Sequence, residues 1–226
     1  MTTTALTTTP PLGRSLPAWL PVVQGIAITT MAVDHVSLWL VSGDIPALLR
    51  VTMGRLALPM FCFMVAWHAL HSTNARRYAD RILFIALAAQ LPFLVLRGEV
   101  LGNICFTLAA AAYLAAYHRH RDPVALVAGV LLAGFTWLNE YGPLALGLVL
   151  AFMAAIRWPL AWLVPLLAWP VLQYGPSLSA VSAFLGVALL LALVTTRLPP
   201  LRLPRPLTRW FYPAHLWLIY LLRGLA

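Results

Sequence analysis

Long apolar runs recur along this chain from residue 20 to residue 222, separated by short polar or proline-containing segments. Nine runs are candidate spanning helices when compared with the roughly 20 apolar residues that a bilayer crossing needs. In chain order they are Leu20–Val41, Leu48–Leu70, Tyr78–Leu96, Leu101–His118, Val124–Leu138, Pro143–Ile156, Pro159–Tyr174, Leu178–Val194 and Trp210–Leu222. The pattern predicts an all-α, polytopic membrane helical bundle. The fifth, sixth, seventh and ninth runs are short, so eight or ten spans stay open alternatives.

The composition supports a membrane protein with a single domain. With 62% hydrophobic and 9% charged residues, the chain has no room for a sizeable soluble domain. Residues 1–18, rich in threonine and proline, predict a disordered tail, and residues 19–226 predict one transmembrane domain. The first apolar run contains Asp34 and is followed by no small-residue cleavage site, so we expect a retained helix and not a signal peptide. Cys62 and Cys105 lie inside apolar runs and predict no disulfide framework.

The distribution of arginine predicts how the nine spans are oriented. The net charge of +9 comes from fifteen arginines that sit mostly between spans, so we expect no nucleic-acid partner. With a cytoplasmic N-terminus, the inner side holds Arg14, Arg76, Arg77, Arg81, Arg119, Arg121, Arg157, Arg197, Arg202, Arg205 and Arg209, and the outer side holds Arg50, Arg55, Arg97 and Arg223. Eleven arginines inside against four outside follow the positive-inside rule. We therefore predict a multi-pass protein of the bacterial inner membrane, with its C-terminus outside.

Two ionisable residues lie well inside the first apolar run. Asp34 and His35 are adjacent, and an Asp or Arg at a helix centre costs about 2.5–3.5 kcal/mol on insertion scales. Such residues usually face a bundle interior or a wet cavity, which makes them candidate functional residues. Adjacent helical side chains point about 100° apart, so Asp34 and His35 need different partners. We predict an ion pair between Asp34 and Arg55 that leaves His35 neutral as a general base; a structural ion pair with a packed histidine is the alternative.

Polar residues of four spans are predicted to share one depth. By the ~1.5 Å helical rise, each lies about 10 Å below the outer end of its span. These residues are Asp34, Arg55, Gln90 and Thr107, with Asn103 and Glu140 slightly nearer the outer face. Interhelical hydrogen bonding, worth about 0.6 kcal/mol on average, is the alternative for Asn103 and Thr107.

Three further histidines lie within or at the ends of the predicted spans. His68 and His71 have helical i,i+3 spacing, but no further ligands accompany them, so we predict no metal site. His215 lies about 8 Å inside the inner face of the last span. Interfacial anchoring explains the nearby Trp210 and Tyr212 but does not explain His215.

Six short segments, taken together and in order, resemble the TraX family, membrane proteins linked to N-terminal acetylation of conjugative pilin. They are Met31–His35, Gly54–Phe61, Tyr78–Ile82, Gln90–Phe93, Asn103–Leu108 and Tyr212–Leu216. The chain departs from the usual family pattern at Leu58 and Ala89, both packing changes, and residues 143–200 carry no family motif. The wider group looks like the transmembrane acyltransferases, which take acyl groups from cytoplasmic acyl-CoA.

The resemblance implies acetyl transfer from acetyl-CoA to the N-terminal amine of a pilin-like or other membrane-associated acceptor. His35 would act as general base, and Arg55, Asn103 or Thr107 would stabilise the oxyanion. Asp34 would hold Arg55 or orient a histidine from another helix. The full predicted catalytic set is Asp34, His35, Arg55, Asn103, Thr107, Gln90 and His215. The predicted CoA-binding set is Arg76, Arg77, Arg81, His68, Arg205, Arg209 and Tyr212.

This mechanism requires a channel from the inner arginines to His35, past His68 or His215. The competing functions are a proton-coupled transporter that uses Asp34, His35 and Arg55, and a non-catalytic assembly factor. Another amide-forming maturation reaction, such as cyclisation, is also open, and the acceptor is a pilin, another peptide, a glycan or a lipid. The sequence predicts no particular oligomeric state.

Overall fold

The computed structural model describes residues 17–225, apart from positions 100 and 200 and the side chain of position 205. Within these residues the chain is helical, and its one isolated β-bridge joins Gly102 to Asn139. In chain order the elements are α1 (Trp19–Trp39), α2 (Asp44–Val51), η1 (Met53–Leu56), α3 (Ala57–His71), α4 (Ala75–Arg97), α5 (Ile104–His120), α6 (Pro123–Gly134), η2 (Phe135–Leu138), α7 (Gly142–Arg157), η3 (Pro159–Trp162), η4 (Val164–Ala168), α8 (Trp169–Tyr174), α9 (Leu178–Thr195) and α10 (Arg205–Leu225). The predicted tail at residues 1–18 lies almost wholly outside the described residues.

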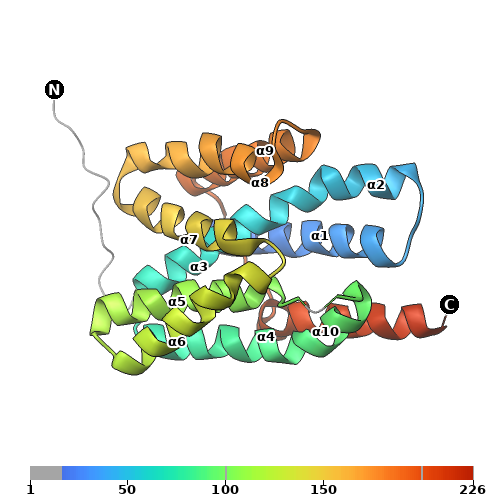
Figure 1. The fold of residues 1–226 in the computed structure, drawn as a ribbon. Helices are drawn as coiled ribbons and strands as arrows, with labels where there is room; N and C mark the ends of the chain where they lie inside the picture. Colours follow the sequence, from blue (N-terminus) through green and yellow to red (C-terminus); the bar gives the residue numbers. More distant parts are fainter. Residues whose placement is uncertain (1–16, 100, 200, 226) are drawn as a thin grey trace.

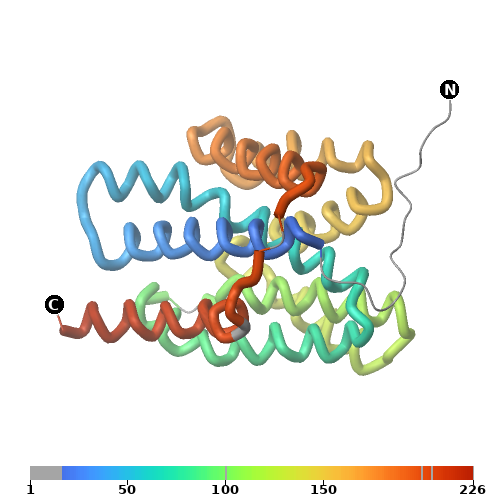
Figure 2. The backbone as a smooth tube through the Cα atoms, turned by 180° about the vertical axis from the view of Figure 1, so that it is seen from behind, coloured from blue at the N-terminus to red at the C-terminus, as the bar shows by residue number. Residues whose placement is uncertain are grey.

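The helices run roughly side by side along one axis (Figures 1 and 2). Helices α2, α8 and α9 form an upper layer, α1, α3 and α7 a middle layer, and α4, α5, α6 and α10 a lower layer. The turns at residues 71–75 and 120–123 lie at the left end of Figure 1, and the turn at residues 40–43 lies at the right end with the C-terminus. The chain therefore passes back and forth along the bundle, while the number of membrane spans and their orientation stay predictions.

The predicted helical bundle is confirmed, and each predicted apolar run corresponds to a helical segment. The second run is longer than predicted, because α2, η1 and α3 join into one segment, Asp44–His71. The last helix begins at Arg205, five residues earlier than predicted, and Pro206 suits a first helical turn because that turn needs no backbone N–H there. The seventh run is broken into η3, η4 and α8, in keeping with the missing N–H groups of Pro165 and Pro170.

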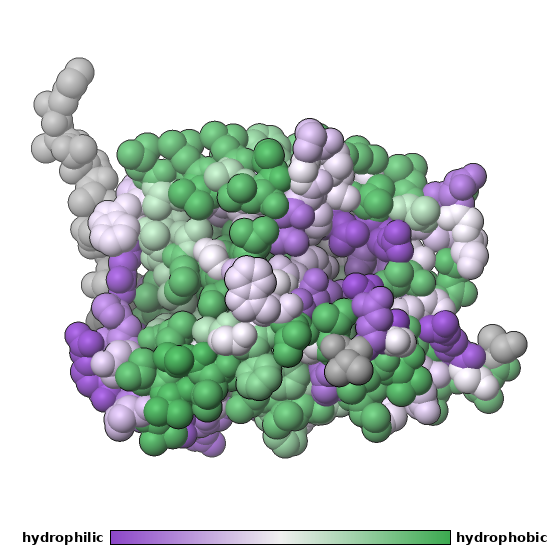
Figure 3. Space-filling model, viewed as in Figure 1, coloured by the Kyte–Doolittle hydropathy of each residue, from purple (hydrophilic) through white to green (hydrophobic). Residues whose placement is uncertain are grey.

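Three helices of the described chain are long and apolar enough to cross a membrane by length and composition: Asp44–His71, Ala75–Arg97 and Leu178–Thr195. The segments at 123–138, 142–157 and 159–174 are shorter but also apolar. On α4 the large side chains of Phe84, Leu87, Leu91 and Val95 are 54–59% exposed and form one stripe. Figure 3 shows apolar side chains covering much of the face seen in that view. A surface of this kind is suited to lipid, so the bundle is a membrane domain.

Small residues let the lower helices approach closely around α5. Six of its alanines are buried: Ala109, Ala110, Ala111, Ala112, Ala115 and Ala116. Across from them, a Cβ atom added at Gly129 of α6 would come within 3.0 Å of the Leu114 backbone nitrogen. Small residues at helix interfaces are the usual means of tight packing in membranes. This packing holds α4 and α5 together below the polar centre of the bundle.

Candidate active site

Two buried histidines from the first and last helices lie in contact. The Nδ1 atom of His35 on α1 is 2.6 Å from the Nε2 atom of His215 on α10. The two ring planes are inclined by only 9° and their centroids are 4.9 Å apart, as expected for two imidazoles that meet edge to edge. The other ring nitrogen of His215, Nδ1, lies 2.8 Å from the carbonyl oxygen of Phe211 one turn earlier on α10. His35, His215 and the Phe211 carbonyl therefore form a chain of hydrogen bonds.

These hydrogen bonds determine which nitrogen of each neutral imidazole carries the proton. A backbone carbonyl only accepts hydrogen bonds, so Nδ1 of His215 must donate to Phe211. Nε2 of neutral His215 is then an acceptor, and Nδ1 of His35 must donate to it. The proton of His35 thus lies on Nδ1, and its Nε2 atom keeps a free lone pair. That is the state a general base requires.

His35 lines an internal cavity of about 450 Å³. At one end the cavity is bounded by Asp34, His35, Glu140 and Tyr141. The middle of the wall is largely apolar, formed by residues such as Met31, Leu58, Phe61, Ile82, Ile104 and Leu108. A mostly apolar pocket with a few convergent polar groups is typical of a small-molecule or cofactor site.

The other end of the cavity is polar and carries positive charge. It is formed by Gln24, His68, Tyr78, Arg81, Thr208 and Arg209. Gln24 and Asp34 are ten residues apart on α1, so the two ends are separated by roughly 15 Å of helical rise. The continuous space predicted between His35 and the inner arginines is present. Two guanidinium groups at its far end, both on exposed residues, make that end attractive to an anion.

Asp34 lies in a space that is open because Gly54, its neighbour on η1, has no side chain. Its carboxylate lies against Gly54 of η1, where an added Cβ atom would overlap Oδ1 and lie only 2.8 Å from Cγ. Asp34 is 7% exposed, and its Oδ1 atom has no hydrogen-bond partner among the described residues. A glycine at position 54 is therefore required for α1 and η1 to approach with Asp34 between them.

The predicted ion pair between Asp34 and Arg55 is wrong: the salt bridges of the described residues do not include it. The Arg55 guanidinium instead lies over the Tyr174 ring of α8, 5.3 Å from its centroid. The cause is helical geometry, because Gly54 and Arg55 are adjacent and point in different directions. Gly54 is the residue that faces Asp34, and Arg55 is turned toward α8. Arg55 still acts on the charge of Asp34, but without direct contact.

A second polar network joins α4 to the loop before α5 and uses Gln90 and Asn103. The Asn103 side-chain Nδ2 donates to the carbonyl oxygen of Ala86 and to Gln90 Oε1, both at 2.8 Å. Its Oδ1 accepts from the Cys105 backbone N–H at 3.0 Å and thereby caps α5. Gln90 Nε2 donates to the carbonyl oxygen of Leu101 at 2.8 Å. Both amides are thus fully engaged in bracing this loop.

Thr107 takes part in a neighbouring brace. Its hydroxyl oxygen accepts from Asn139 Nδ2 at 3.0 Å, and Asn139 lies beside Gly102 in the isolated bridge. The cavity wall includes neither Thr107 nor Asn103 nor Gln90. The polar layer predicted from depth is therefore divided in two: a cavity group around His35, and a bracing group around Asn103. An oxyanion role for Asn103 and Thr107 stays a prediction.

A comparison with protein families gives a match that covers nearly the whole described bundle. The family model named TraX protein matches residues 20–223, a range that includes His35, His215 and every residue of the cavity wall. The chain belongs to the TraX family. The resemblance seen in the sequence motifs is thus confirmed.

One relative of this TraX-family chain is the probable fimbrial assembly protein FimC, serogroup H1, of Dichelobacter nodosus. The two are 34% identical over 100 residues, which is 38% of this chain and 41% of the FimC chain. The match thus spans well under half of that protein. No solved structure matches the chain.

The residues predicted to bind CoA in this TraX protein fall into two groups. Arg81, His68, Arg209 and Tyr212 all line the cavity. The Tyr212 ring lies close to both histidines, 6.4 Å from His35 and 5.6 Å from His215 between centroids. For the predicted Arg205, the backbone begins α10, but the side chain lies outside the described part.

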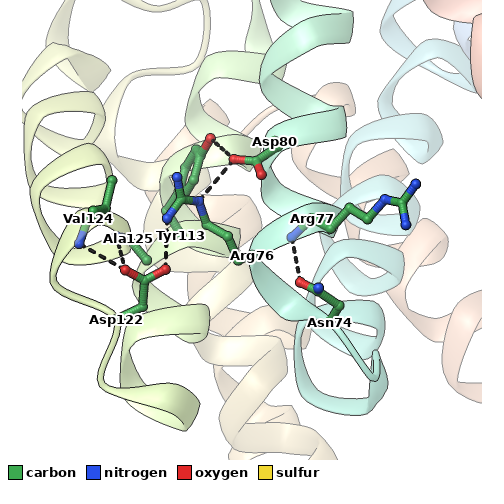
Figure 4. A network of polar contacts seen from close by, with 8 residues as sticks. All are labelled: Asn74, Arg76, Arg77, Asp80, Tyr113, Asp122, Val124 and Ala125. Atoms are coloured by element: carbon green, nitrogen blue, oxygen red, sulfur yellow. Dashed lines mark hydrogen bonds and ion pairs between the residues drawn. The ribbon is translucent and has the colours of Figure 1, made fainter.

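Arg76 and Arg77 are not in the cavity wall. Figure 4 shows the polar contacts around Arg76 and the position of Arg77 beside them. Arg76 Nε lies 3.1 Å from Asp80 Oδ1, and its Nη1 lies 2.8 Å from Asp122 Oδ2. Asp122 in turn accepts from the backbone N–H groups that begin α6. The hydrogen bond from Arg76 holds the pKa of Asp122 below its usual value. Arg77 is exposed and extends away from this network.

The sequence analysis missed several members of the site. Glu140 and Tyr141 close the deep end of the cavity, and Tyr174 contacts Arg55. Glu140 had a detectable signal, since it is an acid between two apolar runs, and we placed it next to the predicted polar layer but did not include it among the site residues. Tyr141 and Tyr174 had none, because tyrosine is common at membrane interfaces. Among the described residues no group of three or more His, Cys, Asp or Glu side chains is arranged to hold a metal.

Proposed function

We propose that this TraX-family protein is a membrane-embedded acetyltransferase of the bacterial inner membrane. It transfers an acetyl group from cytoplasmic acetyl-CoA to an amine, with a pilin-like N-terminus as the favoured acceptor. The observation that carries the proposal is the position of His35 in a cavity whose opposite end carries Arg81 and Arg209. The family match and the printed name of the fimbrial relative support a pilin acceptor.

Acetyl-CoA would bind with its phosphates at the arginine end of the cavity and its thioester near His35. Arg81 and Arg209 suit the phosphates because guanidinium groups bind phosphate through paired, charge-assisted hydrogen bonds. The apolar wall would enclose the pantetheine arm and exclude water from the thioester. His68, at the polar end of the same cavity, would contact the arm where it enters.

The chemical step would use the free Nε2 atom of His35. The acceptor nitrogen attacks the thioester carbonyl carbon, forming the C–N bond, and its surplus proton passes to Nε2. The C–S bond then breaks, and the CoA thiolate takes that proton from His35. Throughout, Nδ1 of His35 continues to donate to His215, so the ring keeps its orientation.

The oxyanion of the tetrahedral intermediate needs a hydrogen-bond donor in the cavity wall. Tyr212 suits this role because its buried hydroxyl has no partner among the described residues and its ring lies beside both histidines. Arg55 would contribute at longer range, through its positive charge. Asp34 would stabilise the His35 imidazolium that forms during transfer, since it bounds the same end of the cavity.

The test is acetyl transfer by purified protein in nanodiscs, using labelled acetyl-CoA and a peptide that carries a pilin N-terminus. We expect turnover in the wild type and a loss of about 10²- to 10⁴-fold in His35→Ala, the usual range for a general base. His71→Ala is the matched control, because His71 bonds to the Trp67 carbonyl oxygen and does not line the cavity. Equal turnover in His35→Ala and wild type would refute the mechanism. A protein that binds no acetyl-CoA would favour the transporter.

A further inference from the structure

Three arginines act on the charge of Asp34 without contacting it, and none of them lines the cavity. They are Arg50 of α2, Arg55 of η1 and Arg97 at the end of α4. All three charges act on the Asp34 carboxylate, yet none forms an ion pair with it among the described residues. The Nε atom of each guanidinium is buried and has no hydrogen-bond partner among the residues that the structure describes.

Two carboxylates are influenced by the charge of these three guanidinium groups. All three act on Asp34, and Arg55 and Arg97 act on Glu140 as well. Arg50, Arg55 and Arg97 are all only half-buried, so they are reachable from outside. Figure 3 shows hydrophilic side chains gathered in a hollow between the middle and lower layers, toward the end of the bundle with the α1–α2 turn.

Neutralising the two acids is not a sufficient role for these arginines. Charges in a low-dielectric interior gain most from direct contact, and each buried donor without a partner is destabilising. Arginines whose only role was to neutralise Asp34 and Glu140 would contact those carboxylates directly. Three guanidinium groups that stand apart, each with a buried donor left unfilled, are instead suited to an anion placed among them.

We infer that Arg50, Arg55 and Arg97 form a binding site for an oxyanion, a carboxylate or phosphate group, carried by the acceptor substrate. Assigning the anion to the acceptor rests on the proposed function. Arg81 and Arg97 are sixteen residues apart on α4, or roughly 24 Å by helical rise. Arg81 and Arg97 therefore lie toward opposite ends of the bundle. Arg81 lines the cavity, and Arg50, Arg55 and Arg97 lie outside the cavity wall, on the side of Asp34 and His35. The acceptor anion would anchor there while its amine reaches His35.

Binding of inorganic phosphate to the purified protein tests the site without requiring activity. The protein is held in phosphatidylcholine nanodiscs at constant ionic strength with saturating CoA, so that the cavity mouth is occupied. Thermal unfolding is then followed as phosphate replaces chloride. We expect a saturable rise in unfolding temperature, and at least a tenfold weaker phosphate affinity in Arg97→Gln and in Arg50→Gln. Arg157→Gln, an exposed arginine on α7, should match the wild type.

Two further measurements distinguish the possible origins of the rise in unfolding temperature. Arg81→Gln should leave the phosphate effect intact, because it changes only the mouth. Nanodiscs that contain phosphatidylglycerol test for a lipid occupant, whose headgroup phosphate would suppress the response to free phosphate. Suppression there would identify the anion as a lipid headgroup and overturn its assignment to the acceptor.

The inference fails if phosphate gives no shift, or if Arg97→Gln and Arg50→Gln respond like the wild type. Acetyl transfer with no phosphate binding would refute this site and leave the proposed function standing. Phosphate binding that depends on Arg50 and Arg97, without acetyl transfer, would keep the oxyanion site and refute the proposed reaction.

Discussion

His35 and His215, 180 residues apart in the chain, share a 2.6 Å hydrogen bond that joins the first helix of the bundle to the last. The bond has a direction, because the Phe211 carbonyl fixes the proton of His215 on Nδ1. His215 therefore holds His35 in the tautomer with Nε2 free. In the proposed reaction His215 is a positioning residue that acts through His35.

Replacing His215 should lower kcat and leave the KM for acetyl-CoA nearly unchanged, because His215 does not line the cavity. We expect a fall of about 10- to 100-fold in His215→Ala. His215→Gln should recover part of it, since a glutamine oxygen accepts from His35 much as Nε2 does. In the double variant with His35→Ala, the His215 change should have no further effect. An additive loss would show that His215 works independently of His35.

Gly54→Ala should destabilise the protein, because the new methyl group would overlap the Asp34 carboxylate. Overpacking of this kind costs about 1–3 kcal/mol. Thermal unfolding in detergent gives the measurement, with Gly147→Ala on α7 as control. Gly147 has open space where the methyl would go and should be neutral or stabilising. Unchanged stability in Gly54→Ala would contradict the close approach of α1 and η1.

The contact between Gly54 and Asp34 also shows what sequence patterns could predict and what they could not. Apolar runs located the helices, and the cost of burying charge identified Asp34 and His35. The partner of Asp34 could not be predicted, because helices in lipid are apolar on nearly every side and carry little sign of which face meets which neighbour. A rotation of η1 about its axis by roughly one residue changes the residue that faces Asp34 from Arg55 to Gly54. The depth of a residue below the membrane surface does not reveal such a rotation. The contact of His35 with His215 spans the whole chain and had no local signal.

Asn103→Ala distinguishes a bracing role from the predicted oxyanion role. The substitution removes the side chain's bonds to Ala86, Gln90 and the Cys105 N–H, leaving buried partners unsatisfied at a cost of about 1–3 kcal/mol. We expect a lower unfolding temperature and an unchanged kcat per folded molecule. Normal stability with a kcat reduced by about 10²-fold would instead restore the oxyanion role.

The contact between Arg76 and Asp122 should make stability depend on pH in a defined direction. Because Arg76 lowers the pKa of Asp122 in the folded state, the ion pair contributes above the ordinary value near 3.8 and is lost as pH falls through the lowered pKa. Asp122→Asn keeps a residue suited to capping α6 but removes the charge. The wild type should therefore be more stable than Asp122→Asn at pH 7, and the difference should shrink below about pH 4. A difference that grows on acidification would contradict the ion pair.

Arg81→Gln and Arg209→Gln should each raise the KM for acetyl-CoA with little change in kcat. The two arginines line the mouth of the cavity and are remote from His35, so they would bind substrate and transition state equally. The effect should weaken at higher ionic strength, because exposed charges are screened. Arg77→Gln is the control: Arg77 lies one turn earlier on α4, is exposed and does not line the cavity, so its KM should stay at the wild-type value. Equal rises in KM for Arg77→Gln and Arg81→Gln would mean that general surface charge, and not the cavity mouth, attracts CoA.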